Sequence, residues 1–220
     1  YCILILEIIS RVYDIQNPLN LNVRERIFLM SIVESRIILC TGGARSGKSE
    51  FAERLVLSLP GQKGYVATGQ IFDDEMEDRV RKHKARRGNI WHNFEIPYDI
   101  TASWSKILDS CDVILIDCLT MYATNAMLKK EPQNQAECNE LADSLVAEFK
   151  ELIDATHKAD KTVVFVTNEL GLGIVPENRM ARFFRDIAGL LNQTVAQAAD
   201  EVYLTISGIT TELKAKEVHI

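Results

Sequence analysis

Residues 37–49 read IILCTGGARSGKS, and this stretch decides the fold. Its apolar start, 37–40, has the composition of a buried strand. The pattern G-x-x-x-x-G-K-S follows, and its glycines let backbone N–H groups turn inward around phosphate oxygens, while the next helix adds partial positive charge. A glycine-rich turn without a ligand is the alternative, but the strand before and the helix after the pattern favour nucleotide binding. The predicted phosphate loop comprises Gly42, Gly43, Ala44, Arg45, Ser46, Gly47, Lys48 and Ser49.

Two loop side chains have predicted tasks of their own. Lys48 is expected to reach the β- and γ-phosphates, and the Ser49 hydroxyl is expected to hold Mg²⁺. A second strand-like stretch, DVILID at 112–117, ends in Asp117, and P-loop proteins place an acid near the metal at the carboxyl edge of the sheet. The alternative is that Asp117 only caps the following turn. With the phosphate loop upstream, the sequence favours a role at the nucleotide or its metal.

The rest of the chain alternates short β-branched runs with longer amphipathic stretches. Further apolar runs occur at 65–67, 113–116, 163–166 and 202–206, and helical patterns at 48–58, 74–87, about 134–156 and 179–199. Near-continuous apolar strands separated by helices of this length indicate a parallel sheet covered on both faces. The predicted fold class is therefore α/β, with a doubly wound, mostly parallel sheet.

Composition excludes several other classes of protein. The 220 residues are 47% hydrophobic and 25% charged, which rules out a disordered or collagen-like chain. A formal net charge of −6 argues against a protein that grips nucleic acid through its overall charge. The five cysteines form no CxxC or Cys/His cluster of the kind that zinc requires. A reducing cytoplasmic location is the expectation.

The first 29 residues lack the patterning of the rest. Residues 2–9 read CILILEII, which is too short for a membrane span, contains Glu7 and lacks the features of a signal peptide. Met30 stands just before the first patterned strand. We expect 1–29 to be an extension outside the fold and 30–220 to form a single P-loop domain. Peptides from 1–29 in mass spectra of protein expressed from its native gene would contradict this expectation.

A basic stretch surrounds one histidine. Six of the nine residues at 79–87 are Lys or Arg, a local concentration that suits a triphosphate. His83 follows Met76 and Val80 at helical spacing, so a packed core histidine is the alternative to a catalytic one. Cationic neighbours favour the neutral imidazole, the form with a free lone pair for attack, and they also neutralise the phosphates under attack. The arrangement suits a nucleotidyl-histidine intermediate on His83.

Four blocks together resemble a known family. They are GGARSGKSEFAERL at 42–55, ATGQIFDDEMEDRVRKHKARR at 67–87, ILIDCLTMYATN at 114–125 and TNELGLGIVPENRMARFFRDIAGLLNQ at 167–193. In this order they resemble the bifunctional adenosylcobinamide kinase/adenosylcobinamide-phosphate guanylyltransferases of cobalamin biosynthesis. The resemblance implies a RecA-like P-loop fold, a corrinoid substrate and a homotrimer with the site near a subunit boundary.

The resemblance also implies two reactions and a set of site residues. The enzyme would phosphorylate adenosylcobinamide with ATP or GTP, and then transfer GMP from GTP to the product through a GMP-histidine adduct on His83. Glu95 and Asp117 match positions that contact the nucleotide. The remaining matched positions that line the nucleotide site are Ala67, Thr68, Gly69, Lys84, Ala85, Arg86 and Arg87.

Two other functions compete with this reading. A small-molecule kinase would explain the phosphate loop and Asp117 but would leave His83 on an ordinary surface helix. A GTP-binding switch normally reads guanine through N-K-x-D, and the nearest candidate, TNEL at 167–170, lacks the Lys and the Asp. The polar residues Asn168, Glu169, Pro176, Glu177 and Asn178 follow a predicted strand, so they either lie beside the substrate or shape the loop that enters the next helix.

Overall fold

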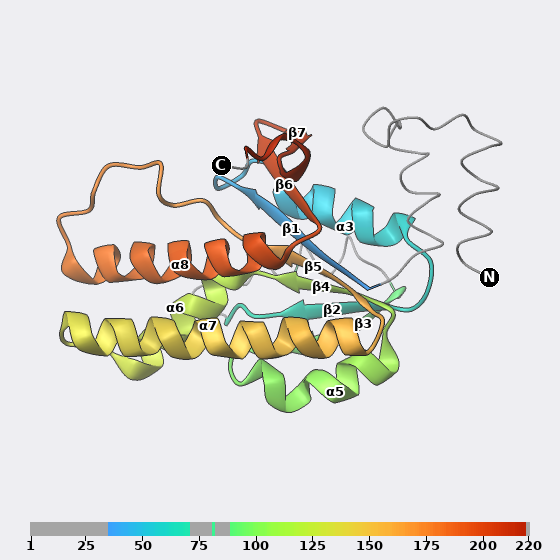
Figure 1. Cartoon of the computed structure of the whole chain (residues 1–220), viewed down its shortest axis with the longest axis horizontal. Helices are drawn as coiled ribbons and strands as arrows, with labels where there is room; N and C mark the ends of the chain where they lie inside the picture. Colours follow the sequence, from blue (N-terminus) through green and yellow to red (C-terminus); the bar gives the residue numbers. More distant parts are fainter. Residues whose placement is uncertain (1–34, 71–80, 82–88, 219–220) are drawn as a thin grey trace. The chain divides into compact units, whose positions relative to one another are not determined.

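The computed structural model describes residues 35–70, 81 and 89–218, all within one compact unit, Glu34–Ile220. The predicted boundary between residues 29 and 30 lies outside the described residues and stays a prediction. With the labels of Figure 1, the elements are β1 (Arg36–Gly42), α3 (Lys48–Ser58), β2 (Lys63–Ala67), β3 (Trp91–Glu95), α5 (Ile100–Ser110), β4 (Val113–Asp117), α6 (Leu119–Lys130), α7 (Gln135–Lys158), β5 (Thr162–Val166), α8 (Arg179–Ala198), β6 (Glu201–Ile206), β7 (Ile209–Glu212) and the short 3₁₀ helix η2 (Lys214–Lys216).

Among the described residues, seven strands form one sheet in the order β3-β2-β4-β5-β1-β6-β7. Every neighbouring pair is parallel except β6 and β7, which form an antiparallel hairpin. The predicted α/β class with a mostly parallel sheet is therefore confirmed. β5 lies between β1, which leads into the phosphate loop, and β4, which ends at Asp117. A strand in this position fits the RecA-like P-loop fold.

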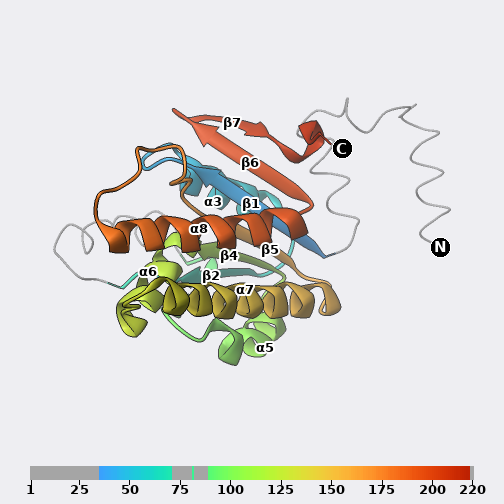
Figure 2. The same ribbon diagram turned by 60° about the vertical axis from the view of Figure 1, so that its left-hand side comes forward.

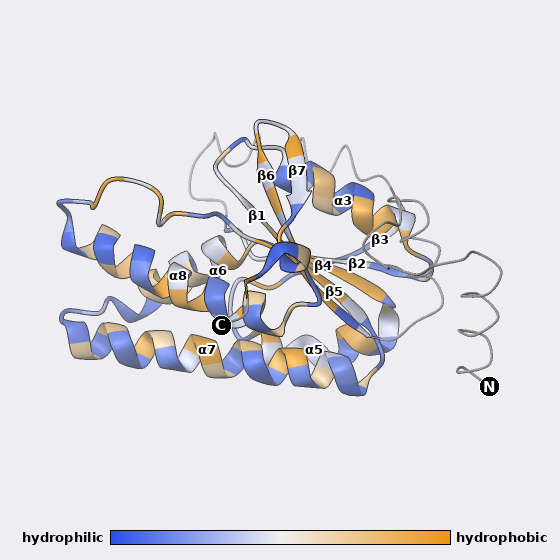
Figure 3. Ribbon diagram, turned by 45° about the horizontal axis from the view of Figure 1, so that its top comes forward, coloured by the Kyte–Doolittle hydropathy of each residue, from blue (hydrophilic) through white to orange (hydrophobic). Residues whose placement is uncertain are grey.

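The sheet is doubly wound, because helices cover both of its faces. Side chains that alternate along each strand are therefore buried on either side. On one face, Ile37 and Leu39 join a hydrophobic cluster with residues of α5, α6, α7 and α8. On the other face, the Phe51 ring of α3 packs against Tyr203, which is in register with Cys40. Figures 1 and 2 show α3 on the opposite side of the sheet from α7 and α8, which run side by side. In Figure 3, β4 and β5 are largely hydrophobic, whereas α7 and α8 alternate in character as half-buried helices do.

Some described elements lie outside the predicted segments, namely β3, α5, α6 and β7. The residue before α5, Asp99, is of a type that commonly caps helices, but its backbone is left-handed and its side chain makes no capping bond. α6 begins two residues after β4 ends, with no turn residue between them. The strand β3 lies at the sheet edge and is mostly exposed, so it lacks an apolar run. The predicted helix at 74–87 lies outside the described residues apart from Arg81, which is helical and exposed.

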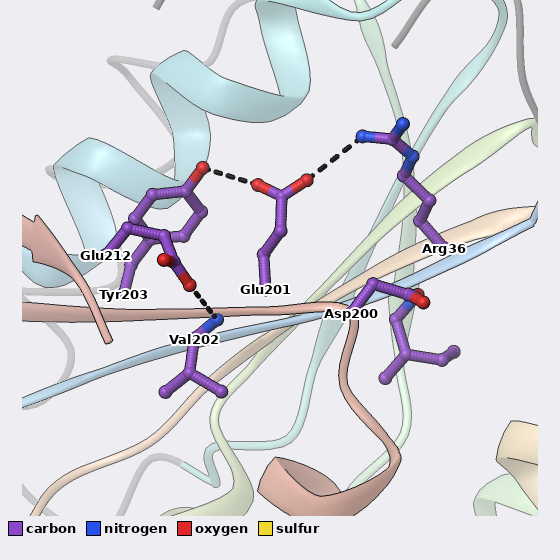
Figure 4. Close-up of polar contacts among 7 residues, drawn as sticks. Arg36, Asp200, Glu201, Val202, Tyr203 and Glu212 are labelled. Carbon is purple, nitrogen blue, oxygen red and sulfur yellow. Dashed lines mark hydrogen bonds and ion pairs between the residues drawn. The ribbon is translucent and has the colours of Figure 1, made fainter. Parts of the chain in front are cut away.

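A polar cluster ties β1 to β6 at the start of both strands (Figure 4). The Glu201 carboxylate accepts hydrogen bonds from the Arg36 guanidinium at 3.0 Å and from the Tyr203 phenol. Burial, followed by the Glu201 charge, raises the pKa of Tyr203, which keeps the phenol protonated as a donor. Asp200 accepts from the backbone N–H of Ile37 at 2.8 Å. These bonds hold the register of the strand that leads into the phosphate loop.

Within residues 35–70, 81 and 89–218, none of the helices combines the length and the apolar character that a bilayer span requires.

Candidate active site

The phosphate loop joins β1 to α3 through a backbone path that needs glycine. Gly42 has φ +153° and Gly47 has φ +98°, both in the region that side-chain-bearing residues rarely adopt. A Cβ added at Gly42 would lie 2.3 Å from the Thr205 carbonyl oxygen. The N-cap of α3 is Gly47, which has no side chain with which to cap the first N–H groups of the helix. This geometry suits an anion at the helix N-terminus.

Lys48 is buried inside the loop that it is expected to serve. Its side chain is 8% exposed, and its ammonium donates a hydrogen bond to the Gly43 carbonyl at 3.1 Å. The neighbouring Ser46 hydroxyl is also buried and has no hydrogen-bond partner among the described residues. Both groups can bond phosphate oxygens without first leaving the loop. The structure therefore brings the predicted loop residues together at the N-terminus of α3, and their phosphate contacts stay predictions.

The predicted acidic residues lie at the carboxyl edge of the same sheet. Ala67 at the end of β2 is in register with Asp117 on one side and with Glu95 on the other. Residues in register on parallel strands have side chains on the same face, which here is the face that α3 covers. The Tyr65 phenol donates a hydrogen bond to the Asp117 carboxylate at 3.0 Å and so orients it. The Asp117 carboxylate and the Ser49 hydroxyl are oxygen groups of the kind that Mg²⁺ prefers, and their predicted role as metal ligands stays a prediction.

Thr68 is fully buried and bridges two connections at this edge. Its hydroxyl donates to the Cys118 carbonyl and accepts from the Cys118 N–H, both at 2.8 Å. The Asn125 side chain donates to the Thr68 carbonyl at 2.7 Å and to the Pro97 carbonyl at 3.1 Å. These bonds hold the end of β2, where Ala67, Thr68 and Gly69 were predicted to line the nucleotide site. The predicted contacts of these three residues with the nucleotide stay predictions.

The thiols near the site are held in the neutral form. Burial, followed by the Asp117 charge, raises the pKa of Cys118 to about 11. Burial also raises the pKa of Cys40, with Glu201 and Asp117 as further causes. A thiol with a raised pKa is a poor nucleophile at neutral pH. Neither cysteine is therefore suited to carry a covalent intermediate.

The predicted nucleophile, His83, lies outside the described residues, and so do Lys84, Ala85, Arg86 and Arg87. The proposed role of each stays a prediction.

The polar residues of the loop between β5 and α8 were predicted either to lie beside the substrate or to shape the loop, and the structure separates the two ends of the loop. Asn178 is the N-cap of α8, and its side chain accepts from the Ala181 N–H at 3.0 Å. Arg182 donates to the carbonyls of Pro176 and Glu177 at 2.9 and 2.6 Å. The far end of this loop therefore has a capping role. Its near end differs, because the Glu169 N–H donates to the Gly42 carbonyl at 3.2 Å and so lies beside the phosphate loop.

The sequence did not indicate a set of polar side chains that contact the backbone at the β5 end of this loop. Thr120 on α6, Thr167 after β5 and Asn192 on α8 are joined by hydrogen bonds to one another and to the backbone of Asn168. Single Thr and Asn residues such as these carry no motif. Only the position of β5 in the sheet brings these side chains close to the phosphate loop.

Comparisons with known proteins show the family of this chain. The family model described as cobinamide kinase / cobinamide phosphate guanyltransferase matches residues 38–213. The "Bifunctional adenosylcobalamin biosynthesis protein CobU" of Salmonella typhimurium is 45% identical over 181 residues, covering 81% of this chain and 99% of the relative. The protein of the same description in Escherichia coli is 41% identical, with 81% and 99% covered. The corresponding CobP protein of Pseudomonas aeruginosa is 35% identical, with 81% and 97% covered.

Solved structures with a lower degree of similarity were also found. The flagellar accessory protein FlaH from Methanocaldococcus jannaschii aligns with a TM-score of 0.40 at 15% identity, covering 81% of this chain and 76% of that one. A KaiC-like protein from Pyrococcus horikoshii aligns with a TM-score of 0.44 at 14% identity, covering 78% and 72%.

Proposed function

The chain belongs to the cobinamide kinase / cobinamide phosphate guanyltransferase family, and we propose that its phosphate loop serves both reactions of that family. It is a bifunctional enzyme that acts on adenosylcobinamide and then on adenosylcobinamide phosphate. The observation that carries this conclusion is the match over residues 38–213, which includes the loop, His83 and Asp117. Relatives described as bifunctional, at 35–45% identity, favour this reading over a kinase without guanylyltransferase activity.

In the kinase reaction, the hydroxyl oxygen of the corrinoid side arm attacks the γ-phosphorus of ATP or GTP. The bond from that phosphorus to the β,γ-bridging oxygen breaks, the nucleoside diphosphate leaves, and the hydroxyl proton is released. In such a transfer, the protein positions the reactants and neutralises charge, and it forms no covalent bond to them. We assign the neutralisation of the phosphate oxygens to Lys48, and its burial and its hydrogen bond within the loop support this assignment.

In the guanylyl transfer, a ring nitrogen of His83 attacks the α-phosphorus of GTP and pyrophosphate leaves. A phosphate oxygen of adenosylcobinamide phosphate then attacks the same phosphorus, the N–P bond breaks, and adenosylcobinamide-GDP forms. We assign the neutralisation of the α-phosphate to the basic residues Lys84, Arg86 and Arg87, with Ala85 between them. Their sequence positions beside the nucleophile support this assignment.

The Ser49 hydroxyl and the Asp117 carboxylate are the proposed Mg²⁺ ligands. Their chemistry fits, because both are oxygen ligands and the Tyr65 phenol already orients the carboxylate. A bound Mg²⁺ would offset the negative charge of the phosphates during transfer. We assign nucleotide contacts to Glu95, in register with Ala67 beside Asp117, and to Ala67, Thr68 and Gly69.

A homotrimer with the site near a subunit boundary and a cytoplasmic location are further proposals, supported by the resemblance to the family. Size-exclusion chromatography with light scattering tests the trimer, because a monomeric mass at assay concentration would contradict it.

Covalent labelling tests the function most directly. The full chain, incubated with α-labelled GTP, should form an adduct that is labile in acid and stable in base, and His83→Ala should abolish it. The matched control is His157→Ala, because His157 is exposed on α7 and bonds to Ser35, at the opposite end of the strands from the loop. An adduct that persists in His83→Ala contradicts the histidine assignment. Failure of the wild-type chain to transfer the γ-phosphate of either nucleotide to adenosylcobinamide contradicts the kinase assignment.

A further inference from the structure

The chain that follows β5 lies between the two parts of the kinase site. β5 is flanked by β1 and β4, so the residues after Val166 lie between the phosphate loop and Asp117. The parallel hydrogen bonding to β1 continues past the end of the strand. The Thr167 N–H donates to the Cys40 carbonyl at 3.0 Å, and the Glu169 N–H donates to the Gly42 carbonyl at 3.2 Å. Asn168, between these two donors, therefore lies next to the start of the phosphate loop.

A closed ring of hydrogen bonds holds the backbone of Asn168. Its N–H donates to the Thr120 hydroxyl at 2.8 Å, and its carbonyl accepts from the Asn192 side chain at 3.0 Å. The Thr167 hydroxyl donates to Asn192 Oδ1 at 2.6 Å and lies 3.2 Å from the Thr120 hydroxyl. Thr120 and Thr167 are buried, so water competes little with these bonds. Side chains from α6 and α8 thus set the position of a single residue beside the loop.

The ring binds the backbone of Asn168 and leaves its side-chain oxygen without a partner. Because the ladder continues, the Asn168 side chain falls on the face opposite to that of Thr167, the same face as Val166 and Asp117. Its Oδ1 is buried and accepts no hydrogen bond among the described residues. A buried polar atom without a partner is unfavourable, so its presence at a site indicates a ligand that completes the bonding.

We infer that Asn168 is a catalytic residue of the kinase reaction, whose carboxamide bonds the transferring phosphoryl group and the attacking corrinoid hydroxyl. The inference rests on the proposed function. The carboxamide has a donor for a phosphate oxygen and an acceptor for a hydroxyl proton, and these are the two groups that must be aligned for in-line transfer. Thr120 and Asn192 are positioning residues that act through the backbone of Asn168.

The test separates the two reactions of one enzyme. In Asn168→Ala, kcat/KM for phosphorylation of adenosylcobinamide should fall about 100-fold, the usual effect of removing one transition-state donor. Adduct formation from α-labelled GTP should stay within about threefold of wild type, because it needs no contact with the acceptor hydroxyl. Asn139→Ala, which truncates an exposed Asn on α7, is the matched control and should change neither. Asn168→Asp keeps the shape and both backbone bonds, and it should also lose kinase activity selectively.

Conservative variants test the positioning role. Thr120→Val removes the acceptor for the Asn168 N–H and should lower kcat of the kinase with little change in KM for the nucleotide, whereas Thr120→Ser should restore the wild-type rate. Equal loss of both reactions in Asn168→Ala and Asn168→Asp, or full kinase activity in both, overturns the inference. A wild-type chain that phosphorylates no corrinoid at all would instead contradict the proposed function.

Discussion

The backbone N–H of Gly208 donates a hydrogen bond to the carbonyl of Ser46 at 2.8 Å, so the turn between β6 and β7 supports the phosphate loop. The carbonyl oxygen of Thr205, near the end of β6, occupies the space beside Gly42 into which a Cβ would project. The conformation of the loop therefore depends on a hairpin near the other end of the described chain, as well as on its own glycines.

We therefore expect substitution by alanine to affect stability differently at two adjacent glycines. In Gly42→Ala, the new Cβ would meet the Thr205 carbonyl and the Ser46 hydroxyl, and the backbone would be strained at φ +153°. We expect a loss of stability of more than about 2 kcal/mol and weak nucleotide binding. In Gly43→Ala, the new Cβ meets nothing within 4 Å, so the melting temperature should stay near that of wild type. Thermal unfolding and GTP titration calorimetry measure both quantities, and equal melting temperatures for the two variants would contradict the expectation.

The bond between Tyr65 and Asp117 predicts a change in the response to Mg²⁺. Tyr65→Phe removes the phenol that orients the carboxylate, and we expect the Mg²⁺ concentration for half-maximal kinase activity to rise about tenfold. Tyr203→Phe is the control, because it also removes a phenol-to-carboxylate bond, to Glu201 on β6. An equal shift in both variants would show that Tyr65 acts on the fold rather than on the metal ligand.

The hydrogen bonds of Asp112, which immediately precedes β4, lead us to expect that the stability of the fold depends on pH. Its carboxylate accepts from Lys161 at 2.8 Å and from the Gln62 N–H at 2.8 Å, and these bonds lower its pKa from 3.8. A lowered folded-state pKa stabilises the fold above the unfolded pKa, and this stabilisation is lost as the pH falls through the folded pKa. Asp112→Asn should therefore melt earlier than wild type at neutral pH, by a small amount because the side chain is 48% exposed.

The difference between Asp112→Asn and wild type should shrink as the pH is lowered from about 5 to about 3. Melting curves across this range measure it, with Asp109→Asn on the exposed side of α5 as the matched control for the loss of a surface carboxylate. A difference that grows on acidification would contradict the sign of the pKa shift.

The raised thiol pKa values predict slow alkylation of the native chain. Cys118, with its pKa near 11, and Cys40 are both buried. At about pH 8, we expect iodoacetamide to modify these thiols at least about 100-fold more slowly in the native chain than in the chain unfolded by guanidinium. Unfolding exposes the thiols and separates them from the nearby carboxylates. Peptide mapping by mass spectrometry follows each site. Rapid native labelling of Cys118 would indicate a thiolate and contradict this account.

Much of the site could be read from local sequence, because its chemistry is carried by contiguous motifs. The phosphate loop, Lys48 and the acid at the end of β4 all follow from short patterns beside apolar runs. The basic stretch around His83 indicated a nucleotidyl-histidine intermediate, and the resemblance to a family implied the same role for this residue. By contrast, Tyr65 and Thr120 have no motif, and their importance follows only from the atoms that they contact.

The sequence by itself determined the fold class and the phosphate loop, since apolar periodicity and a contiguous motif are local properties of the chain, and its resemblance to a family indicated the pair of reactions. Only the tertiary structure decided that β5 lies between the loop and Asp117, and hence that Asn168 lies beside the phosphate loop. The physical reason is that strand order depends on how distant segments pack. Residues that follow β5 meet residues of α6 and α8 in one ring of hydrogen bonds, although no pattern along the chain connects them.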